Sequence, residues 1–121
     1  RVGRPSVLHA TATGKVLLAF GGARVPEALV AYTERTITDP AELERELERV
    51  RASGIAQAAG EREPDLAALA APVLGRGGVL AAILGLQGPA VRVRVAALRE
   101  PLRRAAEELT RSLGGPAQLQ G

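Results

Sequence analysis

The pattern of apolar residues changes at Gly54, and this change constrains the fold more than any other feature of the sequence. Residues 39–54 have the marks of one amphipathic helix: Asp39 as cap, Pro40 at the first position, and a stripe formed by Leu43, Leu47 and Val50. After Gly54, three short runs, IAQAAG, LAALAAPVL and VLAAILGLQ, are typical of strands, and the sequence GRGG joins the last two. The pattern therefore predicts a helix that leads into an antiparallel hairpin.

Three further helices are predicted. The segment HATATGKVLLAF indicates a largely buried helix that starts among residues 10–13 and ends at Gly21-Gly22. A short amphipathic helix is expected from Pro26 to about Tyr32. The last helix is expected to begin near Glu100 or to kink there, because Pro101 lacks a backbone donor, and its apolar positions are Leu98, Leu102, Ala105, Ala106, Leu109 and Leu113.

Two finer predictions concern side-chain placement. The outer face of the 39–54 helix offers the ion pairs Glu42/Arg45, Glu46/Arg49 and Glu48/Arg51. On the last strand, simple alternation puts Leu80, Ala82, Leu84 and Leu86 on a bulky face. The opposite face is then formed by smaller groups, with Ala81, Ile83, Gly85 and Gln87.

Length and composition place the chain among small single-domain proteins. It has 121 residues, a formal net charge of +3 and no cysteine, so it offers neither a disulfide framework nor thiolate chemistry. No apolar run approaches the roughly 18 residues that a membrane helix needs, and no secretory leader is recognisable. We therefore expect a cytoplasmic protein that does not interact with membranes.

The glycine-lysine pair at Gly14-Lys15 raises the question of an anion site. A nucleotide-binding P-loop is excluded, because His9 and Val16 occupy two of its four defining positions. The small residues before the helix leave its first N–H groups open to an anion. The alternative is that Thr11 and Thr13 only cap the helix and that Gly14 permits close packing.

Other site chemistries find little support. His9 is the only histidine, no metal-ligand cluster is present, and Ser6, Ser53 and Ser112 have no GxSxG setting. The charges of GEREPD are typical of a solvated loop. A helix-turn-helix is disfavoured, because the connector between the 26–32 and 39–53 helices is too long and the second helix has four glutamates against three arginines. No catalytic residue, cofactor or metal is therefore predicted.

The order of motifs resembles one family. LHATATGKVLLAF, TERTIT, ELERVRASGIA, EREPDLAALAAPVL, GGVLAAILGLQGP, a closing amphipathic helix and SLGG follow one another as in the effector-binding domain of IclR-type bacterial transcriptional regulators. The resemblance implies an α+β, GAF-like fold, in which helices flank a curved antiparallel sheet. It assigns residues 1–114 to an effector-binding domain without its first strands. The composition of the closing residues 115–121 indicates a flexible tail. The resemblance also implies that DNA is bound only through a separate amino-terminal winged helix-turn-helix.

The resemblance further implies a ligand pocket. Backbone N–H groups of Ala12 and Thr13 would face the acid end of a small organic effector. Family members often carry polar groups at the positions of Ala58, Ala68, Gly85 and Gln87, and here three of the four have no polar side chain. Each lost hydrogen bond removes roughly 0.5–1.5 kcal/mol. An aromatic or aliphatic acid is therefore favoured over a very polar keto acid, with an apolar wall made by Leu66, Ala68, Ile83 and Gly85.

Three hypotheses remain. The first is a ligand-sensing and oligomerisation domain, dimeric or tetrameric, that modulates DNA binding by a population shift. The second is a structural self-association module whose pocket is vestigial. The third, a small hydrolase or transferase, lacks a convincing nucleophile and base.

Overall fold

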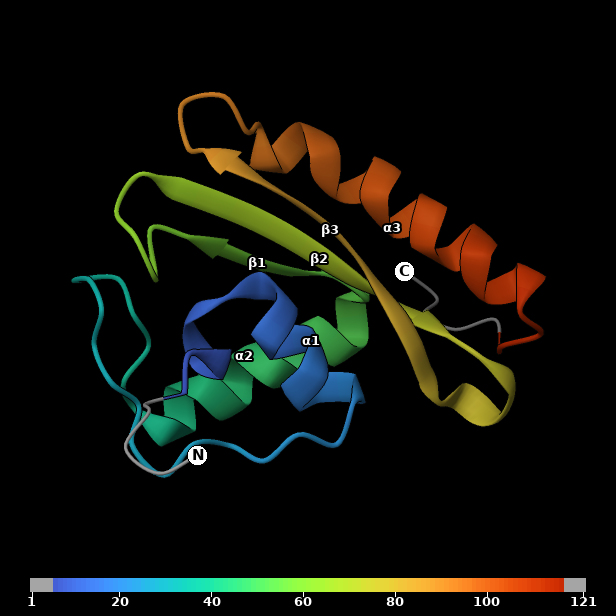
Figure 1. Ribbon diagram of the computed structural model, residues 1–121, viewed down its shortest axis with the longest axis horizontal. Helices are drawn as coiled ribbons and strands as arrows, with labels where there is room; N and C mark the ends of the chain where they lie inside the picture. Colours follow the sequence, from blue (N-terminus) through green and yellow to red (C-terminus); the bar gives the residue numbers. More distant parts are fainter. Residues whose placement is uncertain (1–5, 117–121) are drawn as a thin grey trace.

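Helices cover both faces of a three-stranded antiparallel sheet in the computed structural model, which describes residues 6–116 (Figure 1). The strands β1 (Ala56–Ala59), β2 (Leu66–Leu74) and β3 (Leu80–Pro89) lie in the order β1-β2-β3. Helices α1 (Ala12–Phe20) and α2 (Pro40–Ser53) pack on one face, and α3 (Val95–Ser112) packs on the other. Short 3₁₀ turns, η1 (Leu8–Ala10) and η2 (Arg76–Gly78), precede α1 and join β2 to β3. The predicted α+β class and antiparallel hairpin are confirmed.

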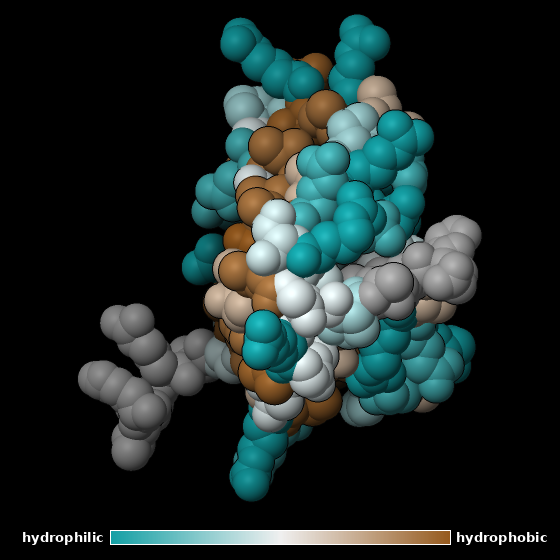
Figure 2. Space-filling model, turned by 90° about the vertical axis from the view of Figure 1, so that its right-hand side faces the viewer, coloured by the Kyte–Doolittle hydropathy of each residue, from teal (hydrophilic) through white to brown (hydrophobic). Residues whose placement is uncertain are grey.

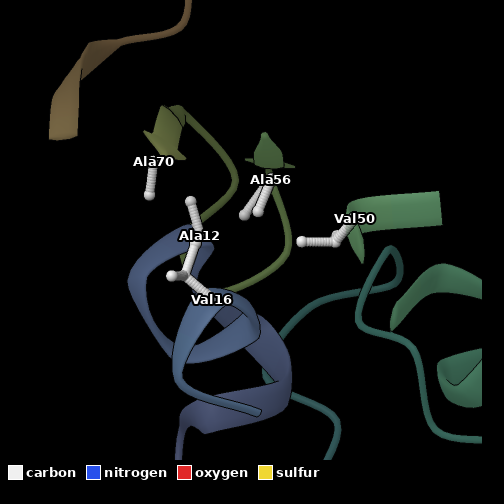
Figure 3. Close-up of a cluster of buried hydrophobic side chains, with 6 residues drawn as sticks. Ala12, Val16, Val50, Ala56 and Ala70 are labelled. Atoms are coloured by element: carbon white, nitrogen blue, oxygen red, sulfur yellow. The ribbon is translucent and has the colours of Figure 1, made fainter. Parts of the chain in front are cut away.

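The central strand β2 divides the core into two apolar clusters. Its Ala70 packs with Ala12 and Val16 of α1, Val50 of α2 and Ala56 of β1, and these side chains converge in Figure 3. Alternate residues of β2 face α3 and form a second cluster: Leu69, Ala71 and Val73 with Leu102 and Ala106. Because β2 is buried on both faces, its sequence is a continuous apolar run rather than an alternating one.

A proline is tolerated inside β2 because β1 is short. The carbonyl of Leu66 accepts from the Gly60 N–H, so Leu66 and every second residue after it point their backbone groups toward β1. Pairing with β1 ends at Ala70, so Pro72 gives up no bond of the sheet. The next such group, the N–H of Leu74, donates instead to Oγ1 of Thr110 on α3, at 3.0 Å.

A bulge near the start of β3 changes one predicted face. Leu74 pairs with Leu80, but Val73 pairs with Ala82, so Ala81 is an extra residue on β3. The bulge turns Leu80 to the side of α1, where it packs in the same cluster as Ile83. The prediction that Leu80 shares a face with Ala82 is therefore wrong.

The predicted helices α1 and α2 are confirmed. Gly54 ends α2 in the left-handed conformation with φ 77°, and Asp39 accepts the Leu43 N–H through its carbonyl but makes no side-chain cap. Of the predicted ion pairs, Glu46 and Arg49 form theirs at 2.7 Å. In the described part of the chain Glu42 and Arg45 form no ion pair, and Arg51 pairs with Glu44 at 3.6 Å instead of with Glu48.

The predicted helix from Pro26 to Tyr32 is wrong, because these residues form irregular chain. Side chains take the backbone groups that a helix would use. The Val30 carbonyl bonds to Nε2 of His9 at 2.8 Å, and the Tyr32 N–H donates to Oγ1 of Thr36 at 3.0 Å. A segment of so few residues gains little from helix formation and cannot displace these contacts.

The last helix begins at Val95, five residues before the predicted start, and continues through Pro101. Val95 and Leu98 pack against the cluster of Leu69 and Leu102, which offsets the loss of one backbone bond at the proline. Two of the predicted apolar positions, Leu109 and Leu113, are exposed. Of the predicted tail at 115–121, residues 117–121 lie outside the described range. Within residues 6–116, no helix combines the length and the apolar character that crossing a membrane requires.

Candidate functional site

The start of α1 carries two free backbone donors. Thr11 is the N-cap residue, and its Oγ1 accepts from the Gly14 N–H at 3.0 Å while its carbonyl accepts from the Lys15 N–H. The N–H groups of Ala12 and Thr13 belong to the first turn and have no partner within the helix. Neither has a backbone or side-chain acceptor in the described part of the chain. Thr11 therefore caps one donor of the first turn, that of Gly14, and the N–H groups of Ala12 and Thr13 remain available to an anion.

Gly14 brings the preceding turn close to α1. A Cβ at this position would meet the carbonyl oxygen of Leu8, and it would lie 2.5 Å from Leu8 Cα and 2.6 Å from Oγ1 of Thr11. Only glycine permits this approach. The close packing and the capping by Thr11 thus coexist with the free donors. Thr13 is exposed, and the cap of this helix is Thr11 and not Thr13.

A pocket of about 430 Å³ opens beside this helix start. It lies between α1, the sheet and the β1–β2 loop, and it brings together seven of the eight residues expected from the sequence: Ala12, Thr13, Ala58, Leu66, Ala68, Gly85 and Gln87. Ile83 does not line it. That side chain packs instead in the apolar cluster around Val16 and Ala70.

Six lining residues were not anticipated from the sequence: Ala10, Thr11, Arg62, Glu63, Leu69 and Leu86. Arg62 and Glu63 bring charge to a wall that was expected to be apolar. Both belong to GEREPD, whose charges suggested a solvated loop. Their side chains are indeed partly exposed, at 41% and 65%, but the loop folds against the pocket. The guanidinium of Arg62 lies over the ring of Tyr32, and no local pattern in the sequence reveals this contact.

Lys15 does not face this pocket but is fully buried on the other side of α1. Its Nζ donates to Oε2 of Glu46 at 3.0 Å and to the Gln57 carbonyl at 2.8 Å, and it lies 2.9 Å from Oε1 of Glu61. The ammonium therefore ties α1 to α2, to β1 and to the β1–β2 loop. It has no donor left for a ligand, which excludes a phosphate-binding role for the glycine-lysine pair.

The two carboxylates around Lys15 respond in opposite directions. Burial raises the pKa of Glu61, and Lys15 only partly opposes this effect, so the pKa stays above its ordinary value. Burial also acts on Glu46, but Lys15 and Arg49 outweigh it and hold the pKa of Glu46 below its ordinary value. One ammonium thus serves two carboxylates and compensates Glu46 better than Glu61.

His9 has a structural role. Its side chain is fully buried, its Nε2 bonds to the Val30 carbonyl, and its ring lies 6.0 Å from that of Tyr32. In the region the structure describes, no group of three or more His, Asp or Glu side chains is arranged to hold a metal ion.

Comparison with known proteins decides the family. The sequence profile of the family described as "Bacterial transcriptional regulator IclR C-terminal" matches residues 1–111. This chain is a member of the IclR family. Its members regulate transcription and are not enzymes. The family assignment that the order of sequence motifs suggested is confirmed.

Two curated relatives of this IclR-family chain illustrate the match. The HTH-type transcriptional regulator BhcR of Paracoccus denitrificans is 34% identical over 117 residues, which cover 89% of this chain and 42% of BhcR. The HTH-type transcriptional regulator KdgR of Escherichia coli is 37% identical, over 94% of this chain and 47% of KdgR. The chain spans less than half the length of these two relatives.

A solved structure is similar in fold. The inducer-binding domain of the Acinetobacter transcription factor PobR, a double mutant in complex with 3-hydroxybenzoic acid, superposes with a TM-score of 0.72 and 32% identity. The match covers 85% of this chain and 65% of that chain. The ligand belongs to PobR.

Proposed function

We propose that this domain senses a small organic acid in the pocket beside α1. Binding would modulate DNA binding by the amino-terminal domain of an IclR-type regulator, which acts in the cytoplasm as a homodimer or homotetramer. The observation that carries the proposal is the position of the two unpaired N–H groups of Ala12 and Thr13 on the wall of a pocket of about 430 Å³. This size suits a small metabolite.

The part of the lining that the sheet contributes favours an aromatic or aliphatic acid over a very polar keto acid. Ala58, Leu66, Ala68 and Gly85 offer no side-chain hydrogen bond, and Gln87 is the only amide side chain among the described lining residues. A ligand with many polar groups would leave some of them unpaired, at roughly 1–3 kcal/mol each. The PobR complex with 3-hydroxybenzoic acid supports an aromatic acid as the first probe.

Thermal shift against a panel of carboxylates tests the proposal. The panel includes 3-hydroxybenzoate, benzoate and hexanoate, together with their neutral amides. A ligand at one hundred times its dissociation constant adds about 2.7 kcal/mol to the free energy of unfolding, which raises the melting temperature. No response to any compound would contradict the proposal.

A variant in the pocket locates the response. Gly85→Val places a branched side chain at the pocket, and the fold tolerates the added Cβ because its nearest neighbour, the Leu69 carbonyl oxygen, lies at 3.4 Å. We expect this variant to lose the ligand-induced shift. Ala82→Val, an exposed position of the same strand outside the pocket, is the control and retains the shift. A shift that survives Gly85→Val would place the ligand elsewhere.

A self-association module is the second candidate. Large hydrophobic side chains are exposed on β3, on α3 and directly after α3, with Leu86 at 41%, Leu109 at 45% and Leu113 at 49%. Figure 2 shows hydrophobic residues gathered in a band along one side of the molecule. A protein that assembles but gives no shift with any panel compound would favour this candidate. Sedimentation velocity, run with the thermal-shift panel, distinguishes the two.

A further inference from the structure

Arg62 is the cation on the pocket wall. Among the described residues that line the pocket, it alone carries a positive charge, and the rest are apolar or neutral except Glu63. We propose that Arg62, held against the ring of Tyr32, binds the carboxylate of the effector and selects acids over their neutral analogues. The inference rests on the proposed function, since it assigns a role within the same pocket.

Tyr32 connects Arg62 to the residues that precede α1. Cζ of Arg62 lies 5.4 Å from the centroid of the Tyr32 ring, which is within the range of a cation–π contact. The Tyr32 hydroxyl donates to the Ser6 carbonyl at 3.2 Å, and its ring lies against His9. His9 immediately precedes Ala10, which is itself on the pocket wall. Arg62 and the free backbone donors of Ala12 and Thr13 thus line the same pocket.

The loop that carries Arg62 is anchored on both sides. Oγ1 of Thr33 donates to the Gly60 carbonyl, and Oγ1 of Thr36 donates to the Glu61 carbonyl. On the inner side, the Glu61 carboxylate meets the buried ammonium of Lys15. Because the residues directly before Arg62 are fixed in this way, little backbone freedom is lost at this loop when a ligand binds.

The charge of Arg62 is available to a ligand. Its ion pair with Glu63 is long, at 4.0 Å, and both side chains are partly exposed, so the pair contributes little. A carboxylate between the Arg62 fork and the Ala12 and Thr13 N–H groups would form a bidentate ion pair with the guanidinium, which a neutral amide cannot. Glu63, on the same wall, would repel an acid that is not held by the guanidinium.

Matched acid and amide probes test this assignment. Affinities of 3-hydroxybenzoate and hexanoate, and of 3-hydroxybenzamide and hexanamide, are measured by calorimetry for the wild type and for Arg62→Gln. We expect the variant to bind the acids roughly tenfold more weakly or worse, because a charge-assisted hydrogen bond is lost, and to bind the amides unchanged. The control Arg45→Gln, an exposed arginine of α2 outside the pocket, binds both as the wild type does.

Two further variants separate binding from folding. Tyr32→Leu removes the ring under the guanidinium and should weaken acid binding several-fold without affecting the amides, whereas Tyr32→Phe keeps the ring and the preference for acids. Since the Arg62 side chain is partly exposed, Arg62→Gln should melt at the wild-type temperature without ligand. Equal acid binding by the wild type and Arg62→Gln would overturn the inference and leave the sensor proposal intact. A wild type that binds none of the probes would overturn both.

Discussion

The ammonium of Lys15 lies 2.9 Å from Oε1 of Glu61 and 3.0 Å from Oε2 of Glu46, in a site where the lysine is fully buried. The contact joins the inner face of α1 to the loop that forms part of the pocket wall. Lys15 thus faces the core, whereas Ala12 and Thr13 of the same helix line the pocket.

Removal of Lys15 should destabilise the protein strongly. Lys15→Met leaves Glu61 without its cation and Glu46 with only the exposed Arg49, and loss of one partner of a buried ion pair costs about 3–5 kcal/mol. Arg49 is the more exposed partner of Glu46, because its side chain is 66% exposed. Arg49→Met should therefore cost less than about 1 kcal/mol. Urea denaturation of both variants measures the difference. Similar losses in the two variants would contradict the central role of Lys15.

The pH dependence of stability should reveal the raised pKa of Glu61. The pKa of Glu61 is raised in the folded protein, so ionisation above the ordinary glutamate pKa of about 4.3 lowers the free energy of unfolding. Glu46 acts oppositely, because its lowered pKa stabilises the fold above that value and the gain is lost as pH falls through the lowered pKa. Glu61→Gln removes only the first effect.

The stability of the wild type relative to Glu61→Gln should therefore decline as pH rises through the interval above about 4.3, and then become constant. Urea midpoints of both proteins between about pH 4 and about pH 8 provide the measurement. A wild type that gains stability over the variant across this range would show that Lys15 fully compensates Glu61.

Local signals predicted the elements whose hydrogen bonds are local. The cap residue Asp39, the apolar stripe and the closing Gly54 all lie in α2 or directly beside it, so this helix could be predicted from its own segment. The segment around Val30 and Tyr32 failed because its backbone groups bond to the side chains of His9 and Thr36, which no period can reveal. The bulge at Ala81 was equally hidden, since it is defined by pairing with β2.

The candidate site divides in the same way. Eight residues at the start of α1 and on β1, β2 and β3 were expected because the order of motifs matched a family, and seven of them lie together. Ile83 was misplaced, since its side chain fills the core beside Val16. Arg62 was missed because its position depends on Tyr32, in a segment whose structure was wrongly predicted.

Thr110 tests the junction between α3 and the sheet. Its fully buried hydroxyl accepts the Leu74 N–H that has no strand beside it. Thr110→Val keeps the shape but leaves this N–H buried without an acceptor, which should cost about 1–3 kcal/mol. Thr38→Val, at an exposed position, is the matched control and should change stability by less than about 0.5 kcal/mol. Equal urea midpoints for the two variants would contradict the role of this bond.

Gly14→Ala should destabilise the protein although alanine favours helices. In an open helix this change stabilises by about 0.5–1 kcal/mol. Here the new Cβ meets the Leu8 carbonyl oxygen and lies 2.5 Å from Leu8 Cα, and these backbone atoms cannot rotate away. The preceding turn must shift, at a cost of about 1–3 kcal/mol, and Ala10 on the pocket wall moves with it. We therefore expect a lower melting temperature together with weaker binding of any carboxylate that the wild type binds.

Gly75→Ala, whose Cβ has its nearest neighbours at 3.8 Å, is the control that separates this clash from a general effect of the substitution.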